Sequence, residues 1–377
     1  TVGLPYQTRR YTMQAQHMYA QPMSAAENLI VNVGSKRTVL AEGPIGSGKT
    51  SMLHTIARRL PDHIPCYFDC TTKVSGDVAI PNIARLDNGQ GYVTYLTNEE
   101  LGAHLDKPII LMVDEYGKAE RDIKNSLLRI LLERKIGSYT LHPDSIVFAT
   151  TNLGAENVGD MLPAHARNRI VILRLKKPTN MEWLEDFAIP NSLDPVVCSW
   201  AKDNPQLFHD FQDVPNPDDN PFIFHPQAPS SEQFVTPRSL HAVSDIMQVR
   251  EHFSDDLLTA SLMGTIGKRG AMDLMAYVKI GDQLPSLESI KTDPSNAKVP
   301  TSPAAVCMVV YKAAQTMGRD WVDAWMTYLV RLDKEAQGLF VNAARNDKYP
   351  HRKIVMTNAK FSEWARDNGY MFAADKK

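Results

Sequence analysis

Residues 43–50 read Gly43-Pro44-Ile45-Gly46-Ser47-Gly48-Lys49-Thr50, a stretch that fits the pattern G-x-x-x-x-G-K-[ST]. The residues before it, 38–42, predict a strand that enters the stretch, and the residues after it, 51–60, predict a helix that leaves it. This order of strand, glycine-rich loop and helix is typical of a phosphate-binding loop. The alternative is a chance match in a glycine-rich turn, and the flanking strand and helix argue against it.

Each residue type in this loop has a chemical reason to be there. Glycines let the backbone pass close to a phosphate, so that successive N–H groups and the start of the helix face its negative charge. We expect Lys49 to reach the β- and γ-phosphates and the Thr50 hydroxyl to bind a magnesium ion. The sequence therefore predicts that the chain binds a nucleoside triphosphate with Mg²⁺. The predicted nucleotide-binding residues are Gly43, Pro44, Ile45, Gly46, Ser47, Gly48, Lys49, Thr50 and Ser51.

The composition of the 377 residues sets limits on partners and location. Basic and acidic residues nearly balance, 41 against 43, so no overall charge favours nucleic acid or a membrane surface. No apolar run is long enough to span a membrane, and no signal sequence is visible. The four cysteines show no metal-ligand spacing. We expect buried thiols, a reducing compartment and a cytoplasmic protein of two or three domains.

A second cluster follows the apolar run 109–113, which is typical of a strand buried on both faces of a parallel sheet. The run ends in Asp114 and Glu115. Asp114 is placed to hold the magnesium ion, through water, as the acidic partner of the phosphate loop. Glu115 is the predicted general base that polarises the attacking water. The alternative is that the pair only caps the helix predicted over 121–135, but the upstream phosphate loop favours the catalytic interpretation.

Asn152 follows a third predicted strand, 145–149. An asparagine at a strand end can simply close a turn. Here its side chain is placed to hold the attacking water or the γ-phosphate. In open α/β sheets the ligand lies outside the carboxyl ends of the strands. Because the phosphate loop, the Asp114–Glu115 pair and Asn152 each follow such an end, we expect them to share one site.

Arg167 and Arg169 do not follow this rule, because they precede the strand predicted over 170–175. We expect them at the amino end of that strand, away from the nucleotide of the same chain. One interpretation is that they are solvated charges. The other is an arginine finger that reaches the γ-phosphate bound to a neighbouring subunit. The second interpretation requires an oligomeric ring.

The composition changes after residue 178. Prolines recur between 190 and 237, too often for regular structure, and phenylalanines among them favour an ordered loop packed on the core over a partner site. Thr236 and Pro237 then predict a helix start. Arg238 in the first turn is electrostatically unfavourable unless it faces a bound phosphate, and the alternative is an exposed arginine without a role. Beyond residue 303 the spacing of aromatic residues predicts helices with a buried face.

Two hairpins are predicted within the α/β region. Residues 86–95 combine turn residues with alternating polarity, and residues 135–141 form a shorter candidate. A surface hairpin and a hairpin that contacts the substrate are both compatible with the first pattern.

Together these segments resemble the AAA+ ATPases and, within them, the MoxR-like group. The similarity covers residues 25–250 and lies in stretches that appear in the family's order, namely 42–50, 114–115, 149–152, 162–169 and 236–240. It implies an α/β P-loop NTPase (AAA+) fold with a parallel sheet core, a small helical lid and a C-terminal helical extension. The expected boundaries are 1–178 for the core with its hairpin insertions, 179–290 for the lid with a Pro-rich insertion at 190–236, and 291–377 for the extension.

The resemblance also implies roles for single residues. Asn152 would be the first sensor, Arg169 the finger, with Arg167 able to share that role, and Arg238 the second sensor on the lid. In such relatives the hairpin insertions face the pore of the ring or the partner. We therefore expect an ATPase that forms a homo-oligomeric ring, a hexamer, and remodels a protein partner in the manner of a chaperone. Such relatives often work with a partner that carries a von Willebrand A domain.

Three other functions stay open. A nucleic-acid motor or loader on the same fold needs a basic pore or face, which the balanced charge does not favour. A nucleotide switch that does not hydrolyse is disfavoured by the intact pair Asp114 and Glu115. A small-molecule kinase has no need of the predicted sensors and fingers, and label transfer from ATP to an acceptor would identify it.

Overall fold

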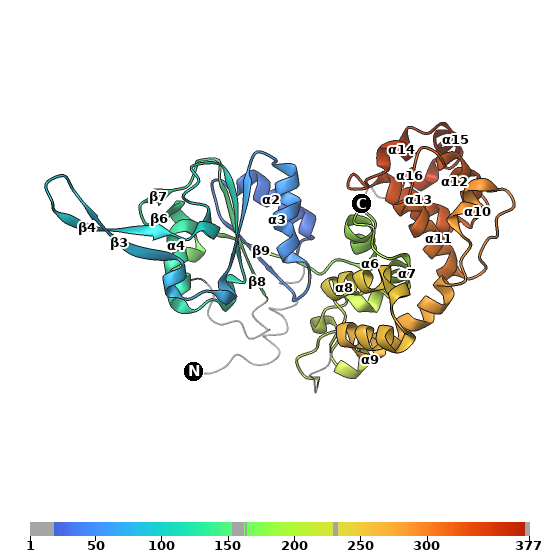
Figure 1. Cartoon of the computed structure of the whole chain (residues 1–377), viewed down its shortest axis with the longest axis horizontal. Coiled ribbons are helices and arrows are strands. Elements are labelled where there is room, and N and C mark those ends of the chain that lie inside the picture. Colours follow the sequence, from blue (N-terminus) through green and yellow to red (C-terminus); the bar gives the residue numbers. More distant parts are fainter. Residues whose placement is uncertain (1–18, 153–161, 163, 229–232, 374–377) are drawn as a thin grey trace. The chain divides into compact units, whose positions relative to one another are not determined.

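The structure is a computed structural model, and it describes residues 19–152, 162, 164–228 and 233–373 (Figure 1). The chain divides into two compact units between Lys177 and Pro178. Each unit is described by itself. The predicted division of the second unit into 179–290 and 291–377 stays a prediction. Pro163, which belongs to the family-like stretch 162–169, lies outside the described residues.

The first unit contains a five-stranded sheet in the order β2-β5-β8-β1-β9. All of its strand pairs are parallel. The central strands β5 and β8 are buried along their whole length, as expected of strands covered on both faces. The strands are β1 (Val39–Gly43), β2 (Ile64–Asp69), β5 (Ile109–Asp114), β8 (Ile146–Asn152) and β9 (Val171–Arg174).

Helices cover both faces of this sheet. Ile30 of α2 and Ile56 of α3 pack in one buried cluster with Phe148 of β8. On the other face, Ile123 of α4 packs with Leu111 of β5. These layers and the loop after β1 form the predicted α/β P-loop NTPase fold. The helices are α2 (Met23–Val33), α3 (Met52–Arg59), α4 (Arg121–Glu133) and α5 (Ala164–Arg167).

Both predicted hairpins are present in the first unit. Strands β3 (Ala79–Arg85) and β4 (Gly91–Thr97) form the longer one, which projects from the sheet in Figure 1. Strands β6 (Lys135–Ile136) and β7 (Tyr139–Thr140) form the shorter one. Gly89 in the longer hairpin has a φ of 80°, a conformation that glycine adopts without strain.

The β3–β4 hairpin is anchored at its base and along one flank. At the base, Lys73 Nζ forms an ion pair with Glu100 Oε2 at 2.7 Å. Along the flank, Thr94 Oγ1 lies 2.8 Å from Ser138 Oγ in the β6–β7 turn, within hydrogen-bond distance. Two polar contacts therefore join the hairpin to the rest of the unit.

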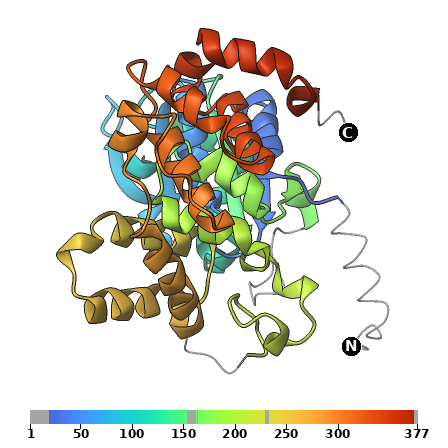
Figure 2. The same cartoon turned by 90° about the vertical axis from the view of Figure 1, so that its right-hand side faces the viewer.

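The second unit consists of helices and short turns in its described residues, and one hydrophobic core runs through it (Figures 1 and 2). Trp200, Leu262, Trp325 and Phe340 all belong to that core. The helices are α6 (Asn180–Trp183), α7 (Pro195–Asp203), α8 (Pro237–Gln248), α9 (Asp255–Gly281), α10 (Leu287–Thr292), α11 (Pro303–Gln315), α12 (Val322–Leu329), α13 (Lys334–Arg345), α14 (Arg352–Met356), α15 (Ala359–Asp367) and α16 (Tyr370–Ala373).

Helix α7 corrects the prediction that the Pro-rich stretch lacks regular structure. Pro195 stands in the first turn, where a helix needs no backbone N–H, so the proline starts the helix rather than breaking it. The Asp194 side chain caps the same turn by accepting from Val196 N at 2.8 Å. The buried Trp200 packs the segment on the core, as predicted. The predicted helix start at Thr236 is confirmed, since its side chain accepts from Ser239 N.

Candidate nucleotide-binding site

The loop after β1 has the backbone that its glycines predict. Gly46 and Gly48 have φ values of 69° and 94°, which favour glycine. Ser47 Oγ donates to Pro44 O at 2.9 Å and closes the loop on itself. A 3₁₀ turn, Lys49–Ser51, then leads into α3. The predicted helix over 51–60 is thus confirmed in place, with a tighter first turn.

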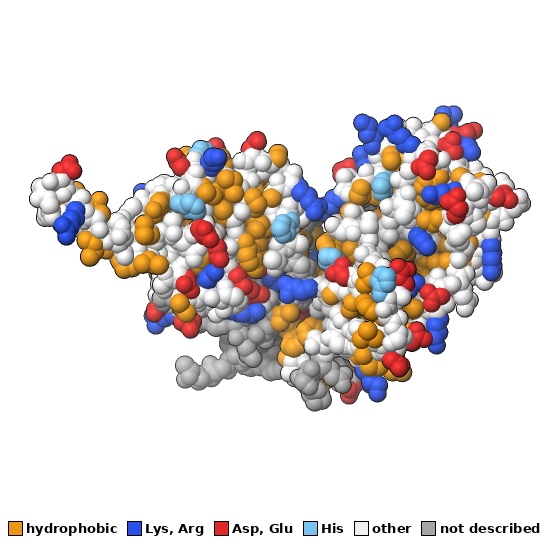
Figure 3. All heavy atoms as spheres, viewed as in Figure 1, with side chains coloured by type: hydrophobic (Ala, Val, Ile, Leu, Met, Phe, Trp, Pro, Cys, Tyr) orange, Lys and Arg blue, Asp and Glu red, His pale blue; other side chains and the backbone are white. Residues whose placement is uncertain are grey.

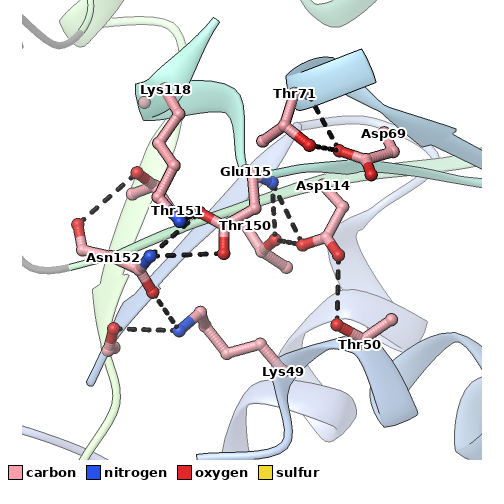
Figure 4. Close-up of polar contacts among 12 residues, drawn as sticks. Lys49, Thr50, Asp69, Thr71, Asp114, Glu115, Lys118, Thr150, Thr151 and Asn152 are labelled. Atoms are coloured by element: carbon pink, nitrogen blue, oxygen red, sulfur yellow. Dashed lines mark hydrogen bonds and ion pairs between the residues drawn. The ribbon is translucent and has the colours of Figure 1, made fainter. Parts of the chain in front are cut away.

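Lys49 is buried within this loop. Its Nζ donates to Gly43 O at 3.0 Å and to Pro44 O at 2.8 Å. It also donates to Asn152 Oδ1 at 2.8 Å (Figure 4). Two residues that lie about a hundred positions apart in the sequence are thereby brought into one cluster, because β1 and β8 are neighbours in parallel register.

Asp114 sits at the centre of a second set of contacts. Thr50 Oγ1 donates to its Oδ2 at 3.0 Å, and Tyr67 OH donates to the same oxygen at 2.9 Å. On the other oxygen, Oδ1, the carboxylate accepts from Thr150 Oγ1 and from Glu115 N. These four donors orient the Asp114 carboxylate beside the loop hydroxyl.

Tyr67 and Thr150 were not predicted as site residues. Both reach Asp114 only because β2, β5 and β8 stand side by side in the sheet, with Tyr67 opposite Met112 and Ala149 opposite Val113. A weak signal for Thr150 was its place just before Asn152 at the end of a predicted strand. No sequence signal distinguished Tyr67.

Glu115 follows β5 and adopts the left-handed conformation, with a φ of 51°. A residue other than glycine or asparagine seldom does so, and such backbones are often found at functional sites. Asn152 Nδ2 donates to both carboxylate oxygens of Glu115, at 3.2 and 3.0 Å. Lys118 Nζ forms an ion pair with Oε2 at 3.1 Å. Asn152 thus connects Lys49 to Glu115.

Burial raises the pKa of several groups near this cluster. Burial raises the pKa of the Tyr67 hydroxyl, and Asp114 raises it further, so the hydroxyl stays protonated and donates. Burial, Asp69 and Asp114 raise the pKa of the Cys70 thiol to about 12. In the same way, burial raises the pKa of Glu42, which precedes the loop, against the opposing effect of Arg174.

No described contact joins the predicted arginines Arg167, Arg169 and Arg238 to this cluster. Arg167 and Arg169 are exposed and stand before β9. Because β9 runs parallel to β1, they lie at the amino end of the sheet, opposite to the loop. Arg167 Nε donates to Leu162 O at 2.9 Å. Arg238 belongs to the second unit, where it is exposed in the first turn of α8.

The sheet order, the loop and the side chains at three strand ends together define an α/β P-loop NTPase fold. No protein-family model matches the chain, and no curated protein matches it. Among the described residues, no helix is long and apolar enough to cross a membrane.

Some solved structures are similar to the chain at low identity. The RuvB Holliday junction branch migration motor of Thermotoga maritima is 18% identical, with a TM-score of 0.36 over 72% of this chain and 74% of that chain. NtrX from Brucella abortus is 13% identical, with a TM-score of 0.32 over 97% and 71%. A putative ATPase from Cytophaga hutchinsonii is 13% identical, with a TM-score of 0.29 over 84% and 79%. At such low TM-scores these likenesses carry no functional inference for this chain.

Proposed function

We propose that the protein is an AAA+ ATPase of the MoxR-like kind, which hydrolyses ATP with Mg²⁺ in a cytoplasmic homo-oligomeric ring, a hexamer, and uses the energy to remodel a protein partner. The observation that carries the proposal is the continuous contact from Lys49 through Asn152 to Glu115. A phosphate-binding lysine and a candidate base thereby belong to one cluster.

The residues present suit a nucleotide phosphate with magnesium. Thr50 directs its hydroxyl proton at Asp114, which leaves the oxygen lone pairs for a metal ion. Among the described residues, no group of three or more His, Cys, Asp or Glu side chains could hold a metal ion by itself. A site that offers only the Thr50 hydroxyl and the Asp114 carboxylate suits Mg²⁺, because Mg²⁺ keeps several waters and takes further ligands from substrate phosphates. When bound, Mg²⁺ would neutralise charge on the phosphate oxygens.

The chain's own residues would then divide the chemistry. Lys49 would bind the phosphate oxygens, and the loop N–H groups would orient them. Glu115 would take a proton from the attacking water, while Asn152 would hold that water or the γ-phosphate in line. Glu115 has a left-handed backbone conformation, and its carboxylate accepts hydrogen bonds from Asn152.

Completion of the site by a neighbouring subunit is part of the proposal. Arg169, with Arg167, is exposed at the end of the sheet opposite to its own loop, so its only route to a γ-phosphate is in another copy. A mixture of Arg169→Ala and Lys49→Ala subunits should regain part of the activity, because some interfaces would combine an intact loop with an intact arginine. No recovery in an assembled ring would contradict a finger in trans. Arg238 is proposed as the second sensor.

A protein partner is favoured by the β3–β4 hairpin. Several of its large apolar side chains are exposed, among them Ile83 at 76%, and hydrophobic atoms gather along it in Figure 3. Residues 79–97 contain only two charged side chains, Arg85 and Asp87, whereas a nucleic-acid site needs a basic surface. Exposed apolar surfaces of this kind mark protein contacts. By resemblance, a von Willebrand A domain protein is one candidate.

The central test is the variant Glu115→Gln. It should bind ATP with near wild-type affinity and lose turnover about a hundredfold or more, as expected when a general base is removed. Lys49→Ala should lose binding as well. Unchanged hydrolysis by Glu115→Gln would contradict the role of the base. The same variant, held in the ATP-bound form, should retain the partner in a pull-down, and a retained nucleic acid would favour the motor or loader instead.

A further inference from the structure

Lys118 reaches Glu115 from within the same turn. Its Nζ lies 3.1 Å from Glu115 Oε2, and the two side chains are 43% and 24% exposed. The turn itself is fixed, because Lys118 N donates to Glu115 O at 2.9 Å and Tyr116 between them is buried. Lys124 Nζ strengthens the turn by donating to Gly117 O. The fixed turn therefore places the Lys118 and Glu115 side chains next to each other, and the ion pair itself brings the ammonium group to the carboxylate.

The two oxygens of Glu115 are unequally engaged. Within the described part of the chain, Oε1 accepts from Asn152 alone, whereas Oε2 accepts from Asn152 and Lys118. A general base must offer a lone pair to the proton that it takes. An oxygen bound to two donors has its lone pairs engaged. Oε2 can thus act only after one of its donors leaves.

The two donors have different connections. Asn152 also contacts Lys49 and so belongs to the phosphate side of the cluster. Lys118 has no second ion-pair partner within the described residues, and Figure 4 shows it entering from the side away from Lys49. Of the two donors, Lys118 is therefore the one that can leave without disturbing contacts to the loop.

We infer that Lys118 is a positioning residue that restrains the general base: its ion pair holds Glu115 Oε2, and this pair must open before that oxygen accepts a proton from water. The inference rests on the proposed ATP hydrolysis. Because both partners are partly exposed, the restraint is weak and depends on ionic strength. It slows basal hydrolysis without blocking it.

The variant Lys118→Met removes the charge and keeps an unbranched side chain. We expect kcat at saturating ATP to rise about two- to fivefold, the range that an exposed ion pair supplies. KM for ATP should change less than about twofold, because Lys118 does not contact the loop. Lys118→Arg keeps a cation and should keep the wild-type rate. As a matched control, Arg129→Met removes an exposed pair with Glu133 on α4 and should leave kcat unchanged.

The dependence of kcat on ionic strength provides a second measurement, which a purely structural role of Lys118 would not affect. Added salt weakens the Lys118–Glu115 pair, so the rate advantage of Lys118→Met over wild type should shrink as salt rises. A lower kcat in Lys118→Met, or a kcat equal to wild type at low salt, would overturn the inference while leaving the ATPase assignment intact. Wild-type protein that does not hydrolyse ATP would instead contradict the proposed function, and the inference with it.

Discussion

Two cations, the half-buried Arg134 and the buried Lys49, lie at opposite ends of the central sheet. At the amino end, Arg134 donates from Nη1 to Thr38 Oγ1 at 2.7 Å and from Nη2 to Gly34 O at 2.8 Å. At the carboxyl end, Lys49 donates to two loop carbonyls and to Asn152. Both side chains join segments that are distant in the sequence.

Arg134 and Lys49 differ in the groups that their hydrogen-bond partners contact. Arg134 joins the end of α2, the start of β1 and the end of α4, and no carboxylate is among its described hydrogen-bond or ion-pair partners. Its planar fork suits fixed carbonyls. Lys49 sits on a glycine loop and leads through Asn152 to the carboxylate of Glu115. The contacts of Arg134 thus stabilise the fold, whereas we propose that Lys49 binds a phosphate.

The largest effect is expected from a variant that disrupts the cluster at the carboxyl end of the sheet. Lys49→Ala should reduce turnover about a hundredfold or more, because it removes the charge that the proposed phosphates need. Calorimetric titration with ATP should find binding weakened in parallel. Denaturant unfolding of the same variant should also show a loss of about 1–3 kcal/mol, because the buried Gly43 O and Pro44 O lose their donor. Wild-type affinity for ATP would contradict the assignment of the loop.

The converse variant is Arg134→Ala at the amino end. We expect it to lower the free energy of unfolding by about 1–3 kcal/mol, because buried carbonyls and the Thr38 hydroxyl lose their donor. ATP affinity should stay unchanged in the folded protein. Urea unfolding and ATP titration of one preparation measure both quantities. Weaker ATP binding by Arg134→Ala, without a lower free energy of unfolding, would contradict the structural role assigned to Arg134.

A smaller effect is expected from Tyr67→Phe. It removes one of the donors to Asp114 and leaves Thr50 in place. The Mg²⁺ concentration for half-maximal turnover should rise about two- to fivefold, since the carboxylate is less well oriented. Tyr92→Phe on the exposed hairpin is the matched control and should change nothing. An identical Mg²⁺ response in both variants would exclude this role for Tyr67.

The smallest effect concerns pH. Burial and nearby carboxylates hold the Cys70 pKa at about 12, so the folded protein keeps this proton when the unfolded chain releases it. The corresponding stability is complete below about pH 8.5 and is lost as pH rises towards 12. Between pH 8 and 9, Cys70→Ala should reduce the loss of unfolding free energy by about 0.7 kcal/mol. If the free energy of unfolding depended on pH equally in wild type and in Cys70→Ala, the raised pKa of Cys70 would be contradicted.

Local patterns in the sequence predict the parts of the site that lie along one segment. The loop residues, Asp114 and Glu115 follow from a motif and a strand end, and the structure has them at these places. Contacts of Tyr67, Thr150 and Lys118 depend on strand register and on the turn after β5, which no local pattern specifies. The number of prolines between 190 and 237 does not predict helix α7, because the effect of a proline depends on its position. Pro195 stands in the first turn, where a helix accepts it.

The path of the chain at the β3–β4 hairpin has a mechanical consequence. The hairpin is inserted between β2 and β5, the adjacent strands that carry Tyr67 and Asp114, and its base is fastened by Lys73 and Glu100. A load on its tip would therefore be transmitted to both strands. The Tyr67–Asp114 hydrogen bond is a side-chain contact of the cluster that joins them.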